Sequence, residues 1–577
     1  GWALLWQWVS LVNGRFSGWL LWLLVIGGWI LAITLIIKRH KTQANRHNSA
    51  FILHRATTGC PSFHWEHFAL FILLLVAFSV RLLAVRDLAF PPWVDSSRHA
   101  LITAVMVEQG QTPSNYAPYL PVDRFPYHFG YHTLSASLEL MTGWDLAQMM
   151  LIFGQLLNTL VVLTIYASGW FFTRRRLVGL LAAFLVALPF FFPAYYVSWG
   201  RMTQLTAVLL MPVLLGLTWR LVRGATLWRQ TWWLVGILAA GVFLVHFRVF
   251  IYFIPFAFIV WLMSLGRNGR WLAIAAGLGA LLVSPHAINL LRVTEPVKTV
   301  AHTIEGYNKF PDGYLNTGWE RWFVYLAGGL FLLLLIPALR RKRWTAVPLA
   351  LVAWVAVLFI ITGADRWGLP GTSLININSM YISIFIPLSL FLAIMADWVW
   401  RWLLRQNWLV QVVAALVAGG VITAVFLFGL FYQINILNDN TILAWRPDVA
   451  GLAWVDENLP EDAVIAASTW KWLGNTWAGH DGGAWLNPLT RHMSNALPID
   501  HIYNRDLFAA NRDMNQQATE IADWSTPAAA DWLRENGFTH IYVGARGGFL
   551  NPAQLNQNPA INLLYSQDGV FIFAINE

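Results

Sequence analysis

Long runs of apolar residues alternate with short polar segments along the first three-quarters of the chain. Many of these runs approach the roughly 20 residues that a helix needs to cross the hydrocarbon core of a membrane. The predicted spans are residues 18–37, 66–86, 147–172, 178–196, 203–222, 231–246, 249–265, 271–290, 322–339, 345–362, 377–398 and 409–433. We therefore predict an α-helical polytopic membrane protein with about 12 to 13 spans. The apolar residues 2–12 could be the end of another span, and a start at Gly1 rather than Met is consistent with a missing upstream segment.

Basic residues occur in every second loop between the predicted spans. The clusters lie at residues 38–41, 174–176, 220–229, 267–270, 340–343 and 401–405. Lys and Arg concentrate in cytoplasmic loops, so these loops are predicted to face the cytoplasm. Three long loops then face outward, at residues 87–146, 291–321 and 363–376.

The C-terminal residues have the alternating pattern of a small α/β domain. Helical spacing occurs at residues 447–458 and 526–536, and short β-like runs occur at 463–467, 539–543, 563–565 and 570–575. The segment 468–524 is expected to form loops with short helices. We predict three parts: an N-terminal span with a basic cytoplasmic linker (1–64), a transmembrane domain (65–439) and an extracytoplasmic α/β domain (440–577).

Charge is divided unevenly between these parts. The chain has a net charge of +9, but the residues from Trp445 onward contain 7 Lys and Arg against 15 Asp and Glu. An acidic tail on a basic membrane body argues against a nucleic-acid partner and favours topology as the cause of the basic balance. Cys60 is the only cysteine, which excludes an internal disulfide and a Cys-rich metal site.

The first outer loop carries the clearest candidate chemistry. Asp95 and His99 are four residues apart in a predicted helix over 95–108, so they share a face. His128 and His132 are also four apart, at the start of a second predicted helix that runs to residue 141, and Asp123 precedes them. These groups could perform acid–base catalysis, and Asp95 and the three histidines could hold a divalent cation. The alternative is a loop helix whose polar residues cap its ends and contact water.

Further polar residues lie at the outer ends of predicted spans. Arg201, His246 and Arg248 occur at outward turns, where arginine can pair with the phosphate of a lipid headgroup. Ordinary interface snorkelling is the alternative for each. Glu305 and Arg366 lie in the second and third outer loops and could close over a substrate, although solvated loop residues have the same pattern.

The second span with Arg81, the loop that begins Pro-Pro-Trp-Val-Asp95 and the segment Phe-Pro-Tyr-His-Phe-Gly-Tyr-His132 together resemble integral-membrane glycosyltransferases of the GT-C class. That class includes protein mannosyltransferases and bacterial arabinosyl- and aminoarabinose transferases. The resemblance extends from about Trp65 into the C-terminal domain, which opens Leu452-Ala-Trp-Val-Asp-Glu-Asn-Leu-Pro. The chain departs from the class in lacking an Asp-x-Asp in the first loop and the Trp-Trp-Asp of oligosaccharyltransferases. These departures disfavour transfer of a whole oligosaccharide and leave the donor sugar open.

The resemblance implies a hexosyl- or pentosyltransferase that takes a sugar from a polyprenyl-phosphate carrier and transfers it to a protein, lipid or glycan acceptor on the outer face of the plasma membrane. Asp95 matches the position of the catalytic acid residue and would act as general base with inversion, and Asp123 is the alternative base. The remaining roles implied are His99 in catalysis; Arg248, Arg201, Arg366, Arg98 and His246 at the donor phosphate; and Tyr127, His128, His132 and Glu305 at the substrate.

The resemblance does not fix a cofactor: a divalent cation held by Asp95 and the three histidines is the candidate, and a reaction that uses Asp95 without a metal is the alternative. No Gly-rich phosphate loop occurs, which disfavours a nucleotide-sugar donor. Two other functions stay open from the sequence: a lipid or solute transporter, and a non-catalytic structural subunit of a membrane complex.

Overall fold

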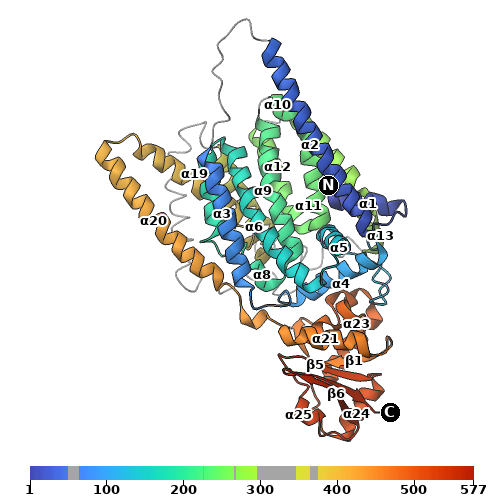
Figure 1. The fold of residues 1–577 in the computed structure, drawn as a ribbon. Helices are drawn as coiled ribbons and strands as arrows, with labels where there is room; N and C mark the ends of the chain where they lie inside the picture. Colours follow the sequence, from blue (N-terminus) through green and yellow to red (C-terminus); the bar gives the residue numbers. More distant parts are fainter. Residues whose placement is uncertain (50–63, 225, 265–267, 295–345, 364–374, 577) are drawn as a thin grey trace.

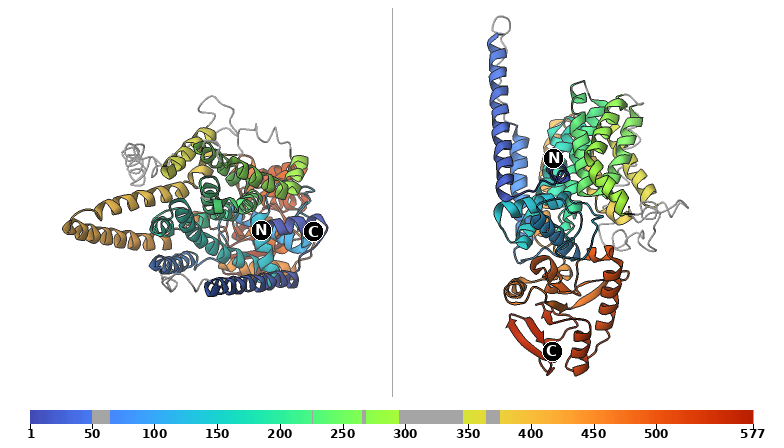
Figure 2. Two further views of the ribbon diagram at one scale, coloured as in Figure 1. Left: turned by 90° about the horizontal axis from the view of Figure 1, so that it is seen from above. Right: turned by 90° about the vertical axis from the view of Figure 1, so that its right-hand side faces the viewer.

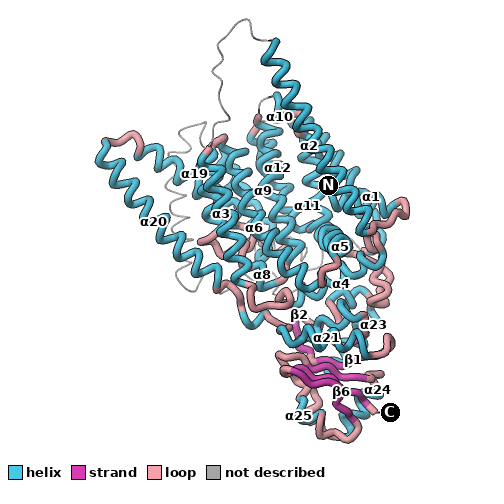
Figure 3. The backbone as a smooth tube through the Cα atoms, viewed as in Figure 1, coloured by secondary structure: helices cyan, strands magenta, loops and turns pink. Residues whose placement is uncertain are grey.

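The structure is a computed structural model that describes residues 1–49, 64–224, 226–264, 268–294, 346–363 and 375–576. A bundle of long helices is followed by a smaller domain at one end of it (Figure 1). All strands of the described residues belong to that smaller domain (Figure 3). The predicted fold class, an α-helical polytopic membrane protein with a C-terminal α/β domain, is confirmed.

Apolar helices form the bundle, because a segment in hydrocarbon must satisfy its backbone N–H and C=O groups internally. Their bounds are α1 Trp2–Leu11, α2 Gly18–Ser49, α3 Trp65–Ala84, α6 Leu146–Thr173, α7 Arg176–Ala187, α9 Met202–Arg223, α11 Trp232–Val245, α12 Phe247–Met263, α13 Gly269–Val293, α17 Ala346–Thr362, α18 Ile377–Tyr381, α19 Phe385–Leu403 and α20 Trp408–Ile434. Among the described residues, 7 helical segments are long and apolar enough to cross a membrane, and four shorter apolar helices accompany them.

Eleven of the twelve predicted spans overlap these helices, and the twelfth, residues 322–339, lies outside the described residues. The prediction of one continuous helix over residues 178–196 is wrong. Helix α7 ends at Ala187, and turns lead to the short helix α8, Tyr196–Trp199. Pro189 and Pro193 lie in this break, where a proline removes the N–H that a helix needs and clashes with the preceding turn.

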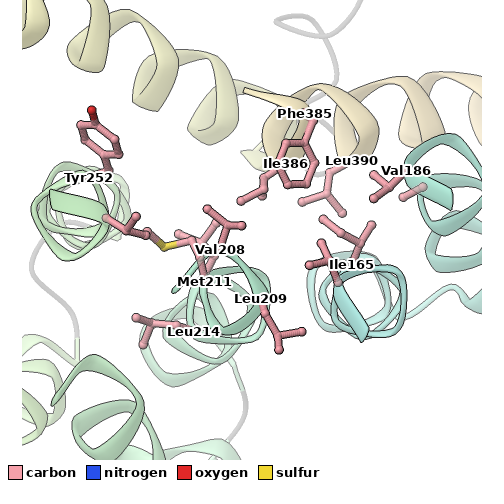
Figure 4. Packing of buried hydrophobic residues seen from close by; sticks show 14 of the residues in the cluster. Ile165, Val186, Val208, Leu209, Met211, Leu214, Tyr252, Phe385, Ile386 and Leu390 are labelled. Carbon is pink, nitrogen blue, oxygen red and sulfur yellow. The ribbon is translucent and has the colours of Figure 1, made fainter. Parts of the chain in front are cut away.

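The centre of the bundle is packed from several helices that are distant in sequence. The side chains of Ile165 on α6, Val186 on α7 and Leu390 on α19 lie close together in the buried core (Figure 4). Helices α6 and α7 approach so closely that a Cβ atom on Gly169 would lie 2.7 Å from the Cα atom of Gly179. The lack of side chains at these two positions therefore sets the helix–helix distance.

Arg81, an arginine inside the second predicted span, is buried and bonded within the bundle. Its Nε donates to Oδ1 of Asn158 at 2.8 Å, and its Nη1 donates to the carbonyl oxygens of Ala77 and Ala187. A charge at this depth is costly unless it is paired in this way. Arg81 thus joins α3 to α6 and to the end of α7.

The C-terminal domain is a mixed sheet with helices on both faces. The sheet order is β4-β1-β5-β7-β6, in which β1 pairs parallel to β4 and β5, and β7 pairs antiparallel to β5 and β6. The strands are β1 Val464–Ala467, β4 Met493–Ser494, β5 His540–Val543, β6 Ile561–Gln567 and β7 Val570–Ile575. Alternate side chains of these strands pack against α21 (Arg446–Asn458) on one face and α24 (Pro527–Glu535) on the other.

The expectation of loops and short helices over residues 468–524 is only partly right. The segment contains a separate hairpin, β2 Thr469–Leu473 with β3 Thr476–Gly479, and a helix of 14 residues, α23 Arg505–Ala518. It also contains the short helices η3 Gly482–Trp485, α22 Leu486–Thr490 and η4 Ile499–Tyr503. Asn504 begins α23, because its side chain accepts from the backbone N–H groups of Asp506 and Leu507.

The basic clusters at residues 174–176, 220–229 and 401–405 lie at the end of the bundle opposite to the C-terminal domain, and the cluster at 340–343 lies outside the described residues. Helix α10 (Thr226–Arg229) and the turn between α19 and α20 are far from the C-terminal domain (Figure 1), and Figure 2 shows α2 extending in the same direction. The guanidinium group of Arg174 lies 5.8 Å from the ring of Trp228 in α10, so two clusters meet there. This arrangement agrees with the alternation of basic and non-basic loops in the sequence.

Candidate active site

The first outer loop forms the layer between the bundle and the C-terminal domain. Its two predicted helices are present, as α4 Val94–Gln109 and α5 Gly130–Thr142, but α5 begins after His128, which was predicted at its start. Apolar residues of α4, α5 and the C-terminal domain belong to one continuous buried cluster, in which Phe90 lies 5.2 Å from Trp485 between ring centres. The loop is thus held rigidly on both sides.

Asp95 lies in the first turn of α4, at a position that several tight contacts define. The backbone of Trp93 adopts a positive φ of 72°, and its N–H donates to the carbonyl oxygen of Thr441. Gly200, which follows α8, packs against this turn so closely that a Cβ atom would lie 2.0 Å from Oγ of Ser96. The φ of Gly200 is also positive, which favours glycine there. This contact brings the start of α9 next to Asp95.

Arg201 is the residue that this packing places beside the Asp95 carboxylate. Its Nε lies 3.6 Å from Oδ2 of Asp95, and its guanidinium group lies 4.9 Å from the ring of Trp199. Burial raises the pKa of the Asp95 carboxyl, and the charges of Arg201, Arg98 and Arg248 oppose that rise, in decreasing order. The result is a carboxylate that is held among cations and is more basic than an exposed aspartate.

Arg248 approaches the same region from the first turn of α12. Its Nη1 donates to Oγ of Ser379 at 2.9 Å. Ser379 belongs to α18, whose first residue follows Asn376, and the Asn376 side chain caps α18 by accepting from the Ser379 N–H. Tyr252 donates its hydroxyl to the carbonyl oxygen of Asn376, so α12 and α18 are joined twice.

Arg98 lies one turn after Asp95 and contacts the C-terminal domain. Its Nη2 donates to Oδ1 of Asp500 at 2.8 Å and to the hydroxyl oxygen of Tyr503 at 2.9 Å. On the other side, its guanidinium group lies 3.6 Å above the ring of Tyr127. Arg98 is thus fixed between the aromatic residue predicted at the substrate and a buried carboxylate of the other domain.

The three histidines predicted in the first loop, His99, His128 and His132, lie close to one another and to His246. Nδ1 of His99 lies 3.1 Å from Nε2 of His132, and the ring centres of His128 and His246 are 4.7 Å apart. Burial lowers the pKa of His99 to about 3, with a smaller contribution from Arg98, so this imidazole is neutral at physiological pH. Within the described residues, no three His, Cys, Asp or Glu side chains are arranged to hold a metal ion.

Two predicted site residues, Glu305 and Arg366, lie outside the described residues. Asp123 is exposed, and its neighbour Arg124 donates to the carbonyl oxygen of Tyr503. The structure therefore brings Asp95, Arg98, Arg201 and Arg248 toward one region and leaves Asp123 at the surface.

Sequence reasoning missed the residues that hold the arginines. Asp500 and Tyr503 accept hydrogen bonds from Arg98, Tyr116 donates to Asp500, and Ser379 accepts from Arg248. None of them stands in a motif with its partner, because 402 residues separate Arg98 from Asp500. A carboxylate at the end of an apolar stretch, Ala-Leu-Pro-Ile-Asp500, was the local signal that the sequence offered.

No family model matches this sequence, and no curated protein matches it. The fold, however, is similar to that of several solved membrane glycosyltransferases. The structure of the oligosaccharyltransferase AglB from Archaeoglobus fulgidus, in complex with an inhibitory peptide and a dolichol-phosphate, aligns with a TM-score of 0.51 and 14% identity over 89% of this chain and 74% of AglB. ArnT from Cupriavidus metallidurans bound to undecaprenyl phosphate aligns with a TM-score of 0.53 and 11% identity over 88% of this chain and 98% of ArnT.

The protein has the GT-C fold. The mycobacterial arabinofuranosyltransferase AftD also has a TM-score of 0.53, at 14% identity over 91% of this chain, although only 41% of AftD is covered. At these identities the likeness concerns the fold. The resemblance drawn from the first outer loop and the span count is therefore confirmed at the level of architecture.

Proposed function

We propose that this protein is a membrane glycosyltransferase that moves a sugar from a polyprenyl-phosphate carrier to a protein, lipid or glycan acceptor. The observation that carries the proposal is the position of Asp95, 3.6 Å from Arg201 and within the electrostatic influence of Arg98 and Arg248. This arrangement combines a base for an acceptor with cations for a phosphate, which are the two chemical needs of such a transfer.

In the proposed reaction, the acceptor hydroxyl oxygen attacks the anomeric carbon of the donor sugar. Asp95 takes the hydroxyl proton, a carbon–oxygen bond forms to the acceptor, and the bond from the anomeric carbon to the phosphate oxygen breaks. The polyprenyl phosphate leaves with the bonding electron pair. One displacement of this kind inverts the anomeric configuration, as in inverting hydrolases.

The arginines compensate the charge of the leaving phosphate. Arg201 and Arg248 stand at the ends of α9 and α12 that face the C-terminal domain, where a headgroup can reach them while its prenyl chain stays among the helices. A guanidinium group pairs with phosphate oxygens in two parallel hydrogen bonds, and in a partly buried site this stabilises developing charge strongly. The polyprenyl phosphates bound to ArnT and AglB support a donor of this class.

We further propose that the C-terminal domain and the first outer loop face the outside of the plasma membrane. The basic clusters at the opposite end of the bundle support this orientation, because Lys and Arg favour the cytoplasmic side. The domain contacts α4 directly and is positioned to select the acceptor.

Sugar transfer by the purified full-length protein from a panel of polyprenyl-monophosphate hexoses and pentoses tests the proposal, with and without EDTA. Asp95→Asn should lower kcat by about 10² to 10⁴-fold, the usual contribution of a general base. Asp123→Asn is the matched control, since it removes the exposed alternative carboxylate, and it should leave transfer unchanged. Normal turnover by the Asp95 variant would reject it as the base. Absence of transfer and of donor binding in the unmodified protein would reject the enzyme assignment in favour of a transporter or a structural subunit.

A further inference from the structure

A carboxylate of the C-terminal domain is buried against the proposed catalytic helix. Asp500 lies in η4, its side chain has no exposed surface, and its Oδ1 accepts from Nε and Nη2 of Arg98 and from the hydroxyl of Tyr116 at 2.6 Å. Removing a carboxylate from water in this way is costly and is tolerated when the charge is paired and hydrogen-bonded. The contact is therefore a specific connection between the domain and the loop.

Without Asp500, Arg98 would have another carboxylate within reach. Asp95 and Arg98 are three residues apart in α4, a spacing at which opposite charges on a helix pair readily. In the described structure, however, the ion-pair partner of Arg98 is Asp500, and the partner of Asp95 is Arg201. Asp500 and Tyr503 draw the Arg98 guanidinium toward the C-terminal domain, where it lies on the Tyr127 ring.

We propose that Asp500 is a positioning residue, through which the docked C-terminal domain holds Arg98 away from Asp95 and over Tyr127. The inference rests on the proposed function and adds to it that the catalytic arrangement is complete only when the C-terminal domain is in place. An unrestrained Arg98 pairs with Asp95, which turns the carboxylate from the acceptor and lowers its basicity.

The test is a double-mutant cycle on sugar transfer with the full chain. Asp500→Asn keeps the size of the side chain and removes its charge, and we expect kcat to fall by about 10 to 100-fold, the range for a misplaced catalytic geometry. The KM for the donor should change by less than about 3-fold, because Arg201 and Arg248 are untouched. The double variant Arg98→Gln/Asp500→Asn should have the same kcat as Arg98→Gln alone, because Asp500 then has no guanidinium to hold.

Glu108→Gln is the matched control. Glu108 also belongs to α4 and also pairs with the C-terminal domain, through Arg491, but this ion pair is exposed and lies at the far end of the helix. The variant should retain full kcat, which separates the effect of Asp500 from a general loosening of the domain contact. Tyr503→Phe removes one contact of Arg98 without removing a charge and should lower kcat by about 2 to 5-fold, so the inference stays testable if Asp500→Asn fails to fold.

Additive losses in the double variant, or an unchanged kcat in Asp500→Asn, would overturn the inference while leaving the proposed function intact. An equal loss in Glu108→Gln would also overturn it, because any weakening of the domain contact would then suffice. If the unmodified protein transfers no sugar from any donor, the proposed function itself fails. This failure is distinguishable from failure of the inference about Asp500, because the unmodified protein is assayed before any variant.

Discussion

Replacement of Arg201 by glutamine removes the cation that lies beside the proposed base. The Nε of Arg201 and the Oδ2 of Asp95 are 3.6 Å apart. At this distance two unit charges attract by about 4 to 5 kcal/mol at an effective dielectric constant of about 20, and by about 1 kcal/mol at that of bulk water. The two side chains are 34% and 24% exposed, so solvent screening reduces the attraction to about 1 to 2 kcal/mol. Loss of this attraction in Arg201→Gln raises the pKa of Asp95.

The assay is kcat/KM for the donor, measured as a function of pH. Asp95 must be deprotonated to accept a proton, so a higher pKa moves the acidic limb of the profile toward higher pH. We expect a shift of about one pH unit in Arg201→Gln and a higher KM for the donor, because the phosphate loses a cation. Arg201→Lys is the control, since it retains the charge and should keep the acidic limb in place. An acidic limb that stays fixed in Arg201→Gln would refute the electrostatic coupling of Arg201 to Asp95.

Three further variants test other parts of the structure. Gly200→Ala places a Cβ atom 2.0 Å from Oγ of Ser96 at a positive φ, so it should displace α4 from α9 and lower both the melting temperature and kcat. Gly143→Ala is the control, because Gly143 has a similar φ and no close atoms, and this variant should lower neither kcat nor donor binding. Asp397→Asn breaks the ion pairs of this buried carboxylate with the partly exposed Arg175 and Arg401, at 2.8 and 2.9 Å, and after screening we expect about 1 to 2 kcal/mol of lost stability. Asp513→Asn, whose ion pair with Arg512 is exposed, should melt like the unmodified protein. Burial raises the pKa of Asp481 to about 7, so its ionisation opposes folding: domain stability falls as pH rises from the ordinary aspartate pKa toward 7, and thermal melts of Asp481→Asn should depend less on pH over this interval. Equal pH dependence in the two proteins would show that Asp481 does not contribute.

The helical architecture could be predicted from the sequence because each span depends only on the residues within it. An apolar run of sufficient length forms a helix whatever its neighbours are, since the bilayer excludes every alternative with unsatisfied backbone groups. Two predicted spans are interrupted. In residues 178–196 the cause is local as well, because Pro189 and Pro193 end α7 early, and residues 377–398 are divided by a turn between α18 and α19. In the C-terminal domain Asp568-Gly569 indicates the hairpin β6–β7, and Gly474-Asn475 is a similar local signal for the hairpin β2–β3, which was not predicted.

The candidate site also has features that the sequence predicts and features that depend on the tertiary structure. The sequence by itself determined the positions of the apolar helices, the two helices between α3 and α6, and Asp95 as a carboxylate on the face shared with His99, because periodicity and charge placement act over a few residues. Only the tertiary structure decided which arginine pairs with Asp95, and that Arg98 turns instead to Asp500, 402 residues away. Which charges pair depends on distances of a few ångströms between separate segments, and those distances follow from the packing of helices and of the C-terminal domain rather than from the order of residues along the chain.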